Sequence, residues 1–97
     1  MIHHLKIHPE DFEVVNDGAK TVELRREDDR QFAVGDVLIL CEIRPELRDL
    51  AEATSDDSIL YTSRVCMRVI THVLRDPEGR WLQSGVAALS IQRLEEV

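Results

Sequence analysis

Aromatic side chains are scarce in this sequence of 97 residues, which contains two Phe, one Tyr and one Trp. A chain of this length predicts a single domain over residues 1–97, and its core must come mostly from Val, Leu and Ile. No apolar run approaches the roughly 20 residues that cross a bilayer, and the N-terminal sequence lacks the apolar stretch of a signal peptide. We therefore expect a cytoplasmic protein that makes no membrane contact.

Positive charge is also in short supply, because 12 Lys and Arg stand against 19 Asp and Glu, for a net charge of −7. Proteins that grip a long phosphate backbone usually carry a positive excess, since their affinity comes from releasing counterions. The composition therefore argues against an extended duplex as a partner. It leaves a local contact with a short single strand, a loop or one nucleotide, or no nucleic acid at all.

Cysteine and histidine occur without the spacing of a metal site. Cys41 and Cys66 lie in separate apolar stretches, which predicts buried free thiols, with a disulfide between neighbouring strands as the alternative. The histidines match no standard zinc pattern, and His3 and His4 should point to opposite faces of one strand. We expect neither a metal nor a cofactor.

Hydrophobic periodicity and turn residues divide the chain into short elements. We expect strands over residues 2–7, 20–25, 37–43 and 85–94, a helix over 9–18, a short helix from Pro45, and over 60–74 one long strand or two strands joined at a bend. Residues 45–60 are either a lid or a surface insertion. Asp36 in Val-Gly-Asp should stabilise its own turn. This order predicts an α+β fold, a small mixed β-barrel with one or two short helices, with an α+β sandwich as the competing topology.

The stretch Lys-Thr-Val-Glu-Leu-Arg at residues 20–25 alternates with a period of two. Val22 and Leu24 should form the buried face of a strand, and Thr21, Glu23 and Arg25 a polar row on the other face. Periodicity alone favours a solvent-facing row with weak cross-strand charge pairs. The charges of the following loop, residues 26–30, largely cancel and predict loop ordering or solubility.

Three motifs follow one another in the first half of the chain: H-x-L-K-I from His3, G-x-K-T-x-E-x-R from Gly18, and D-R-x-F-x-V-G-D-x-L-x-L from Asp29. Their order over residues 3–42 is similar to that of an uncharacterised bacterial and phage branch of the ASCH superfamily, whose fold is the PUA-like β-barrel. Beyond residue 60 the resemblance is only general. The resemblance implies a cleft beside the first helix, lined by Lys20, Glu23 and Arg25, that binds RNA or a modified nucleotide.

The resemblance and the chemistry of the side chains together define the candidate site. Arg25 offers a planar fork of donors for a phosphate or a base edge, and Lys20 a point charge for a phosphate. Glu23 would accept from an exocyclic amine. Tyr61 and Trp81 either stack on a base or cover the edge of the small core, and Tyr61 is the better candidate for stacking. The candidate nucleic-acid-binding residues are Lys6, Lys20, Thr21, Glu23, Arg25, Arg30, Tyr61 and Arg64.

Two other functions remain open. Some small ASCH proteins resemble amidohydrolases or ribonucleases, which would make Lys20 and Glu23 catalytic candidates of a hydrolase acting on a modified nucleoside or RNA. In the amidohydrolase pattern a threonine stands at the position of Glu23, so that mechanism does not transfer directly. Arg25 also favours the charged carboxylate, so recognition is the more economical role. The third function is an acidic module that binds another protein, motivated by the net charge of −7.

Overall fold

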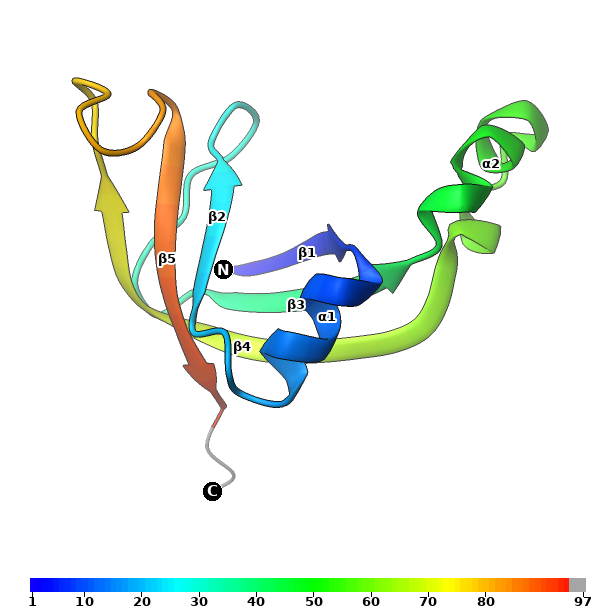
Figure 1. The fold of residues 1–97 in the computed structure, drawn as a ribbon, viewed down its shortest axis with the longest axis horizontal. Coiled ribbons are helices and arrows are strands. Elements are labelled where there is room, and N and C mark those ends of the chain that lie inside the picture. Colours follow the sequence, from blue (N-terminus) through cyan, green and yellow to red (C-terminus); the bar gives the residue numbers. More distant parts are fainter. Residues whose placement is uncertain (95–97) are drawn as a thin grey trace.

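A computed structural model of the chain describes residues 1–94, which form one five-stranded sheet and two short α-helices (Figure 1). The elements are β1 (Ile2–Ile7), α1 (Pro9–Asn16), β2 (Val22–Arg26), β3 (Val37–Ile43), a 3-10 turn (Pro45–Leu47), α2 (Arg48–Thr54), a second 3-10 turn (Asp57–Leu60), β4 (Tyr61–Arg75) and β5 (Val86–Arg93). The sheet curls into a half-barrel, which confirms the expected mixed β-barrel with short helices and not the sandwich.

The sheet has the strand order β1-β3-β4-β5-β2. Only β1 and β3 run parallel, and the other neighbours are antiparallel. The long strand β4 pairs with β3 through residues 61–69 and with β5 through residues 68–75, so it carries the sheet around the curl (Figure 1). This single curved strand answers the ambiguity of residues 60–74. The strands β1 and β2 end the sheet, and each has one edge without a partner strand among the described residues.

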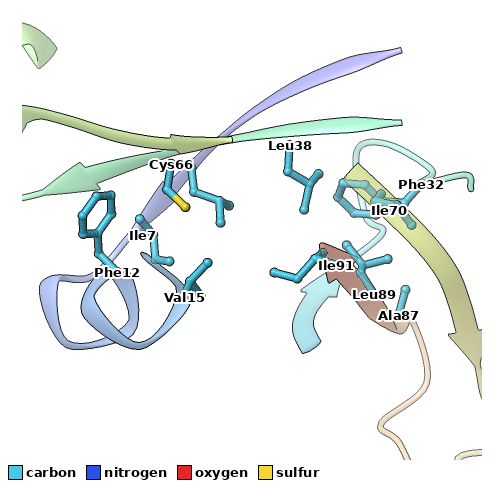
Figure 2. Packing of buried hydrophobic residues seen from close by; sticks show 11 residues of the cluster. Ile7, Phe12, Val15, Phe32, Leu38, Cys66, Ile70, Ala87, Leu89 and Ile91 are labelled. Carbon is cyan, nitrogen blue, oxygen red and sulfur yellow. The ribbon is translucent and has the colours of Figure 1, made fainter. Parts of the chain in front are cut away.

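The core fills the concave side of the curled sheet (Figure 2). Phe12 and Val15 of α1 contribute the helix's apolar stripe, and both are almost fully buried. The buried cluster comprises Ile7, Phe12, Val15, Phe32, Leu38, Leu40, Cys66, Ile70, Ala87, Leu89 and Ile91. Aliphatic residues dominate it, as the scarcity of aromatics predicts. Both cysteines are free thiols, Cys66 buried and Cys41 only half-buried, and burial raises the pKa of the Cys66 thiol.

The helix α1 is held where its backbone needs partners. Pro9 occupies the first turn, where the missing N–H costs nothing. At the other end the last carbonyls lack helical donors, and the nearly buried Arg68 of β4 donates from one guanidinium nitrogen to the carbonyl of Val15 over 2.8 Å. Gly18 then turns the chain with a φ of 90°. The Lys20 amide donates back to the Val14 carbonyl over 2.8 Å, which fixes the start of the segment leading into β2.

The segment between β3 and β4 forms a separate structure at the end of those strands. Its helix α2 follows a turn that starts at Pro45, as the sequence predicts. Ile43, Ala51 and Leu60 form a second, smaller buried cluster there. In Figure 1, α2 stands away from β2 and β5. This segment is therefore a surface insertion with its own small core, and it does not cover the site described below.

The Asp36 carboxylate does more than stabilise its own turn. One oxygen accepts from the Ala33 amide over 3.0 Å, the local bond that the Val-Gly-Asp motif predicts. The same oxygen lies 2.8 Å from Nε2 of the buried His3, which belongs to β1. The His3 contact is the main cause that lowers the pKa of Asp36 to about 2. Asp36 therefore ties β1 to the turn before β3.

Candidate functional site

The strand β2 buries its polar face. Val22 and Leu24 are 41% and 57% exposed, whereas Glu23 is only 3% exposed. The prediction that the Val22 and Leu24 face lies in the core is therefore wrong. The alternation itself is present, but its orientation is reversed.

The pairing of β2 with β5 causes this reversal. In the antiparallel register Glu23 lies opposite Leu89, and Arg25 lies opposite Ala87. Directly opposed residues of neighbouring strands point to the same face of a sheet. Leu89 and Ala87 are fully buried on the concave side, so Glu23 and Arg25 must point to that side as well.

A cavity of about 430 Å³ lies where β2 approaches the end of β1 and the start of α1. This volume falls in the range of about 300–1,000 Å³ that is usual for small-molecule sites. The cavity is lined by Lys6, Ile7, His8, Asp11, Lys20, Val22, Glu23, Leu24 and Arg25. Lys20, Glu23 and Arg25 thus converge on one cavity.

Glu23 is the buried charge at the centre of this group. Its Oε2 accepts from Nε of Arg25 over 3.0 Å. Its Oε1 lies 2.8 Å from Nζ of Lys20, close enough for an ion pair, but the contact lacks the geometry of a hydrogen bond. Oε1 is the one buried side-chain oxygen or nitrogen without a hydrogen-bond partner among residues 1–94. The charge of Glu23 is therefore balanced by two cations, Arg25 at Oε2 and Lys20 at Oε1.

Arg25 joins the two free edges of the sheet. While Nε contacts Glu23, one terminal nitrogen donates to the carbonyl of Lys6 over 3.0 Å. That carbonyl belongs to β1, whose outer edge has no partner strand in the described chain. A planar guanidinium can make both contacts at once because its donors are fixed in a fork. Arg25 thereby bridges β1 and β2 and forms one wall of the cavity.

The cavity carries a local positive excess in an acidic chain. Lys6, Lys20 and Arg25 stand against the carboxylates of Asp11 and Glu23. Lys20 lies between both carboxylates, 2.8 Å from Glu23 and 3.7 Å from Asp11, so its charge is compensated. Lys6 is exposed and forms no ion pair with any residue of the described chain. Lys6, rather than Lys20, is thus the cation that is free to meet an anionic ligand.

A family model described as a domain of unknown function, DUF3850, matches residues 2–91. The chain belongs to the DUF3850 family. A search of curated proteins found no match. The matched range contains every residue that lines the cavity, so the site is part of the DUF3850 domain itself.

Four candidate residues of this DUF3850 domain lie outside the cavity lining. Thr21 is exposed, and its carbonyl accepts from the Ile91 amide over 2.9 Å. Arg30 lies 3.7 Å from Asp29 in the loop after β2. Tyr61 packs against the small cluster beside α2.

The fourth, Arg64, holds α1 against the sheet. Its guanidinium lies 4.4 Å from the centre of the Phe12 ring and 2.8 Å from the Glu13 carboxylate. The structure therefore brings together Lys6, Lys20, Glu23 and Arg25, and places Thr21, Arg30, Tyr61 and Arg64 elsewhere.

Five further residues line the cavity without having been predicted: Ile7, His8, Asp11, Val22 and Leu24. Asp11 stands in the first turn of α1, where its charge predicts only a favourable contact with the helix terminus. His8 precedes that helix, and Leu24 belongs to the face of β2 that periodicity assigns to the core. Their common property is proximity to Lys20 or Arg25, which depends on tertiary contacts and leaves no local signal in the sequence.

The loop after β2 is ordered by its charges, as the sequence predicts. Both oxygens of Glu27 contact the Arg75 guanidinium of β4, at 2.7 and 2.9 Å. The Phe32 amide also donates to Glu27 over 2.9 Å. The hydrogen bonds from Arg75 are the main cause that lowers the pKa of Glu27. These contacts anchor the loop and leave the cavity to other residues.

Metal ligation finds no support in the geometry of this DUF3850 domain. Within residues 1–94, histidine, cysteine and carboxylate side chains nowhere gather in the groups of three or more that would hold an ion. Neither of the two helices described is long and apolar enough to cross a membrane.

Proposed function

We propose that this protein binds RNA or a modified nucleotide in the cavity between β1, α1 and β2. The observation that carries the proposal is the convergence of Lys6, Lys20, Glu23 and Arg25 on one cavity of about 430 Å³. The similarity of the sequence to the ASCH superfamily, with its PUA-like fold, supports the same ligand class. The net charge of −7 restricts the contact to a short segment.

Each cavity residue then has a defined part in recognition. Glu23 accepts from an N–H group on a base edge, as acidic side chains do with the exocyclic amine of cytosine. Lys20 pairs with the carboxylate of Glu23. Lys6 meets a phosphate as a point charge. Arg25 donates to the ligand from the guanidinium N–H groups that contact neither Glu23 nor the Lys6 carbonyl.

The test compares two nearly buried glutamates. In NMR titrations with nucleosides and short RNA, we expect shifts around residues 6–8 and 20–25. Glu23→Gln should weaken binding by about tenfold, because it removes the charged acceptor. Glu42→Gln, on β3, provides the control and should change affinity by less than about twofold. Equal effects of both variants, or shifts that avoid the cavity, would contradict the proposal.

Hydrolysis is a second candidate, and the short contact between Lys20 and Glu23 favours it. A carboxylate and an ammonium 2.8 Å apart beside a cavity could take a proton from water and stabilise a developing oxyanion. Incubation with acylated nucleosides and with RNA, followed by product analysis, tests this activity. Turnover should disappear in Lys20→Ala. Turnover that survives in this variant removes Lys20 from catalysis, and no turnover leaves binding as the function.

A further inference from the structure

Trp81 is the single tryptophan of the chain, and its exposed fraction is 85%. It lies in the loop between β4 and β5. A tryptophan in a small protein usually contributes a large buried area to the core. Trp81 contributes almost none, so its side chain is available to a ligand.

The backbone that carries Trp81 is held in place. Asp76 accepts hydrogen bonds from the amides of Trp81 and Leu82, the latter over 2.9 Å. These backbone contacts lower the pKa of Asp76. The Gly79 amide donates to the Asp76 carbonyl over 2.9 Å and closes the turn. The indole is therefore presented from an ordered loop and needs little rearrangement to bind.

Trp81 lines a groove of about 440 Å³ that adjoins the Glu23 cavity. Leu24 and Arg25 line both hollows, so the two lie next to each other along β2. Arg26 also lines the groove, where it donates to Gln83 over 3.1 Å and pairs with no carboxylate of residues 1–94. No acidic residue of the described chain lines this groove.

We propose that the groove binds the nucleotide adjacent to the one held in the Glu23 cavity, so that the ligand is single-stranded RNA of at least two nucleotides. This inference rests on the proposed function. The base stacks on Trp81, and its phosphate lies at Arg26 or Arg25. Aromatic platforms beside cationic side chains are the usual elements of single-strand binding, and a groove lined by Arg25 and Arg26 without a carboxylate favours an anionic nucleic acid over an apolar peptide.

The single tryptophan makes the test direct. Fluorescence titrations would compare a mononucleotide with di- and tetranucleotides of RNA, for the wild type, Trp81→Phe, Trp81→Ala and Arg26→Ala. We expect quenching by the longer ligands and a gain in affinity of about tenfold from one nucleotide to two, the effect of one stacked base. Calorimetry follows binding in the variants without tryptophan. Trp81→Ala should lose the gain, Trp81→Phe should keep most of it, and Arg26→Ala should reduce the salt slope by about one.

The outcomes separate this inference from the proposed function. RNA binding that is weakened by Glu23→Gln but neither quenches Trp81 nor depends on it would overturn the groove and leave the cavity. Stacking on Trp81 that is unaffected by Glu23→Gln would overturn the cavity and, with it, the binding of two adjacent nucleotides, and would leave Trp81 as an independent RNA contact. Binding of no RNA of any length overturns both. Self-association of the chain that Trp81→Ala abolishes, without an RNA effect, would overturn the proposal in favour of a protein contact.

Discussion

Glu23 and Glu42 are both almost buried, with exposed fractions of 3% and 4%, yet their surroundings differ. Glu42 accepts a hydrogen bond from the Thr62 hydroxyl over 2.7 Å, and its other oxygen lies 3.7 Å from Arg64. Glu23 has Arg25 at 3.0 Å from Oε2 and Lys20 at 2.8 Å from Oε1, although the Lys20 contact lacks hydrogen-bond geometry. Glu23 also lines a cavity.

This difference separates a structural carboxylate from a candidate binding group. Burying a charge is costly, so a buried carboxylate in a fold under no other demand should acquire a full set of donors. Glu42 connects β3 to β4 through a hydrogen bond from Thr62. Glu23 is held between two cations at a surface hollow, where Lys20 and Arg25 also line the cavity that a ligand would enter. Burial alone would not have distinguished the two.

Asp36→Asn should cause the largest loss of stability, because the carboxylate of Asp36 is held by His3, by the Ala33 amide and by the N-terminal ammonium of Met1. The free energy of unfolding should fall by about 3 kcal/mol, since three hydrogen bonds to a charged group are weakened. The pKa of Asp36 is about 2 in the folded protein and 3.8 ordinarily. Its contribution is therefore complete above the ordinary pKa and is lost as the pH falls from about 3.8 towards 2.

Urea unfolding between pH 6 and pH 2 measures both effects. The wild type should lose stability over that window, and the variant should lose less of it. A variant that keeps the acid dependence of the wild type would show that other carboxylates are responsible.

Thr62→Val sharpens the comparison at Glu42. The substitution keeps the side-chain volume and removes the hydroxyl that donates to Glu42. A buried carboxylate oxygen without that donor should cost about 2 kcal/mol of unfolding free energy. RNA affinity should stay unchanged, because Thr62 lies outside the cavity. Chemical denaturation and a binding titration of the same preparation measure the two quantities, and a loss of affinity without a loss of stability would move the site towards Glu42.

Lys6→Ala tests the binding cavity, because Lys6 is a cation of the cavity without an ion pair in the described chain. Binding should weaken by about fivefold at low salt, and the slope of log affinity against log salt should fall by about one. Stability should change by less than about 0.5 kcal/mol, as for other exposed positions. Arg48→Ala in α2 removes an exposed positive charge far from the cavity and is the matched control. If both variants weaken binding equally, the effect comes from net charge and not from the cavity.

Arg30→Ala should have the smallest effect. Arg30 lies in the loop after β2, close to Asp29 and outside the cavity lining. We expect a change in RNA affinity of less than about twofold and in stability of less than about 0.5 kcal/mol, because surface ion pairs contribute little. A larger loss of affinity in the same titrations would extend the binding surface to this loop, as the sequence motif suggests.

The sequence predicted many residues of the site, but not which face of β2 is buried. The motif over residues 18–25 singled out Lys20, Glu23 and Arg25, and the structure gathers them around one cavity. The same alternation placed Val22 and Leu24 in the core, which is wrong. Alternation with a period of two shows only that the two faces of a strand differ in polarity. The neighbouring strand with which it pairs decides which face is buried. For β2 that partner is β5, about 65 residues later in the chain.

The sequence by itself determined the local structure: the strands, the start and end of α1 and the turn at Asp36. Propensity, periodicity and turn chemistry act over a few residues and are written directly in the order of side chains. Only the tertiary structure decided that Arg25 bridges to β1, that Glu23 is buried between Arg25 and Lys20, that Glu27 pairs with Arg75 of β4, and that Trp81 lies beside the cavity. These features depend on the curl of one sheet, which brings together residues that no local pattern relates.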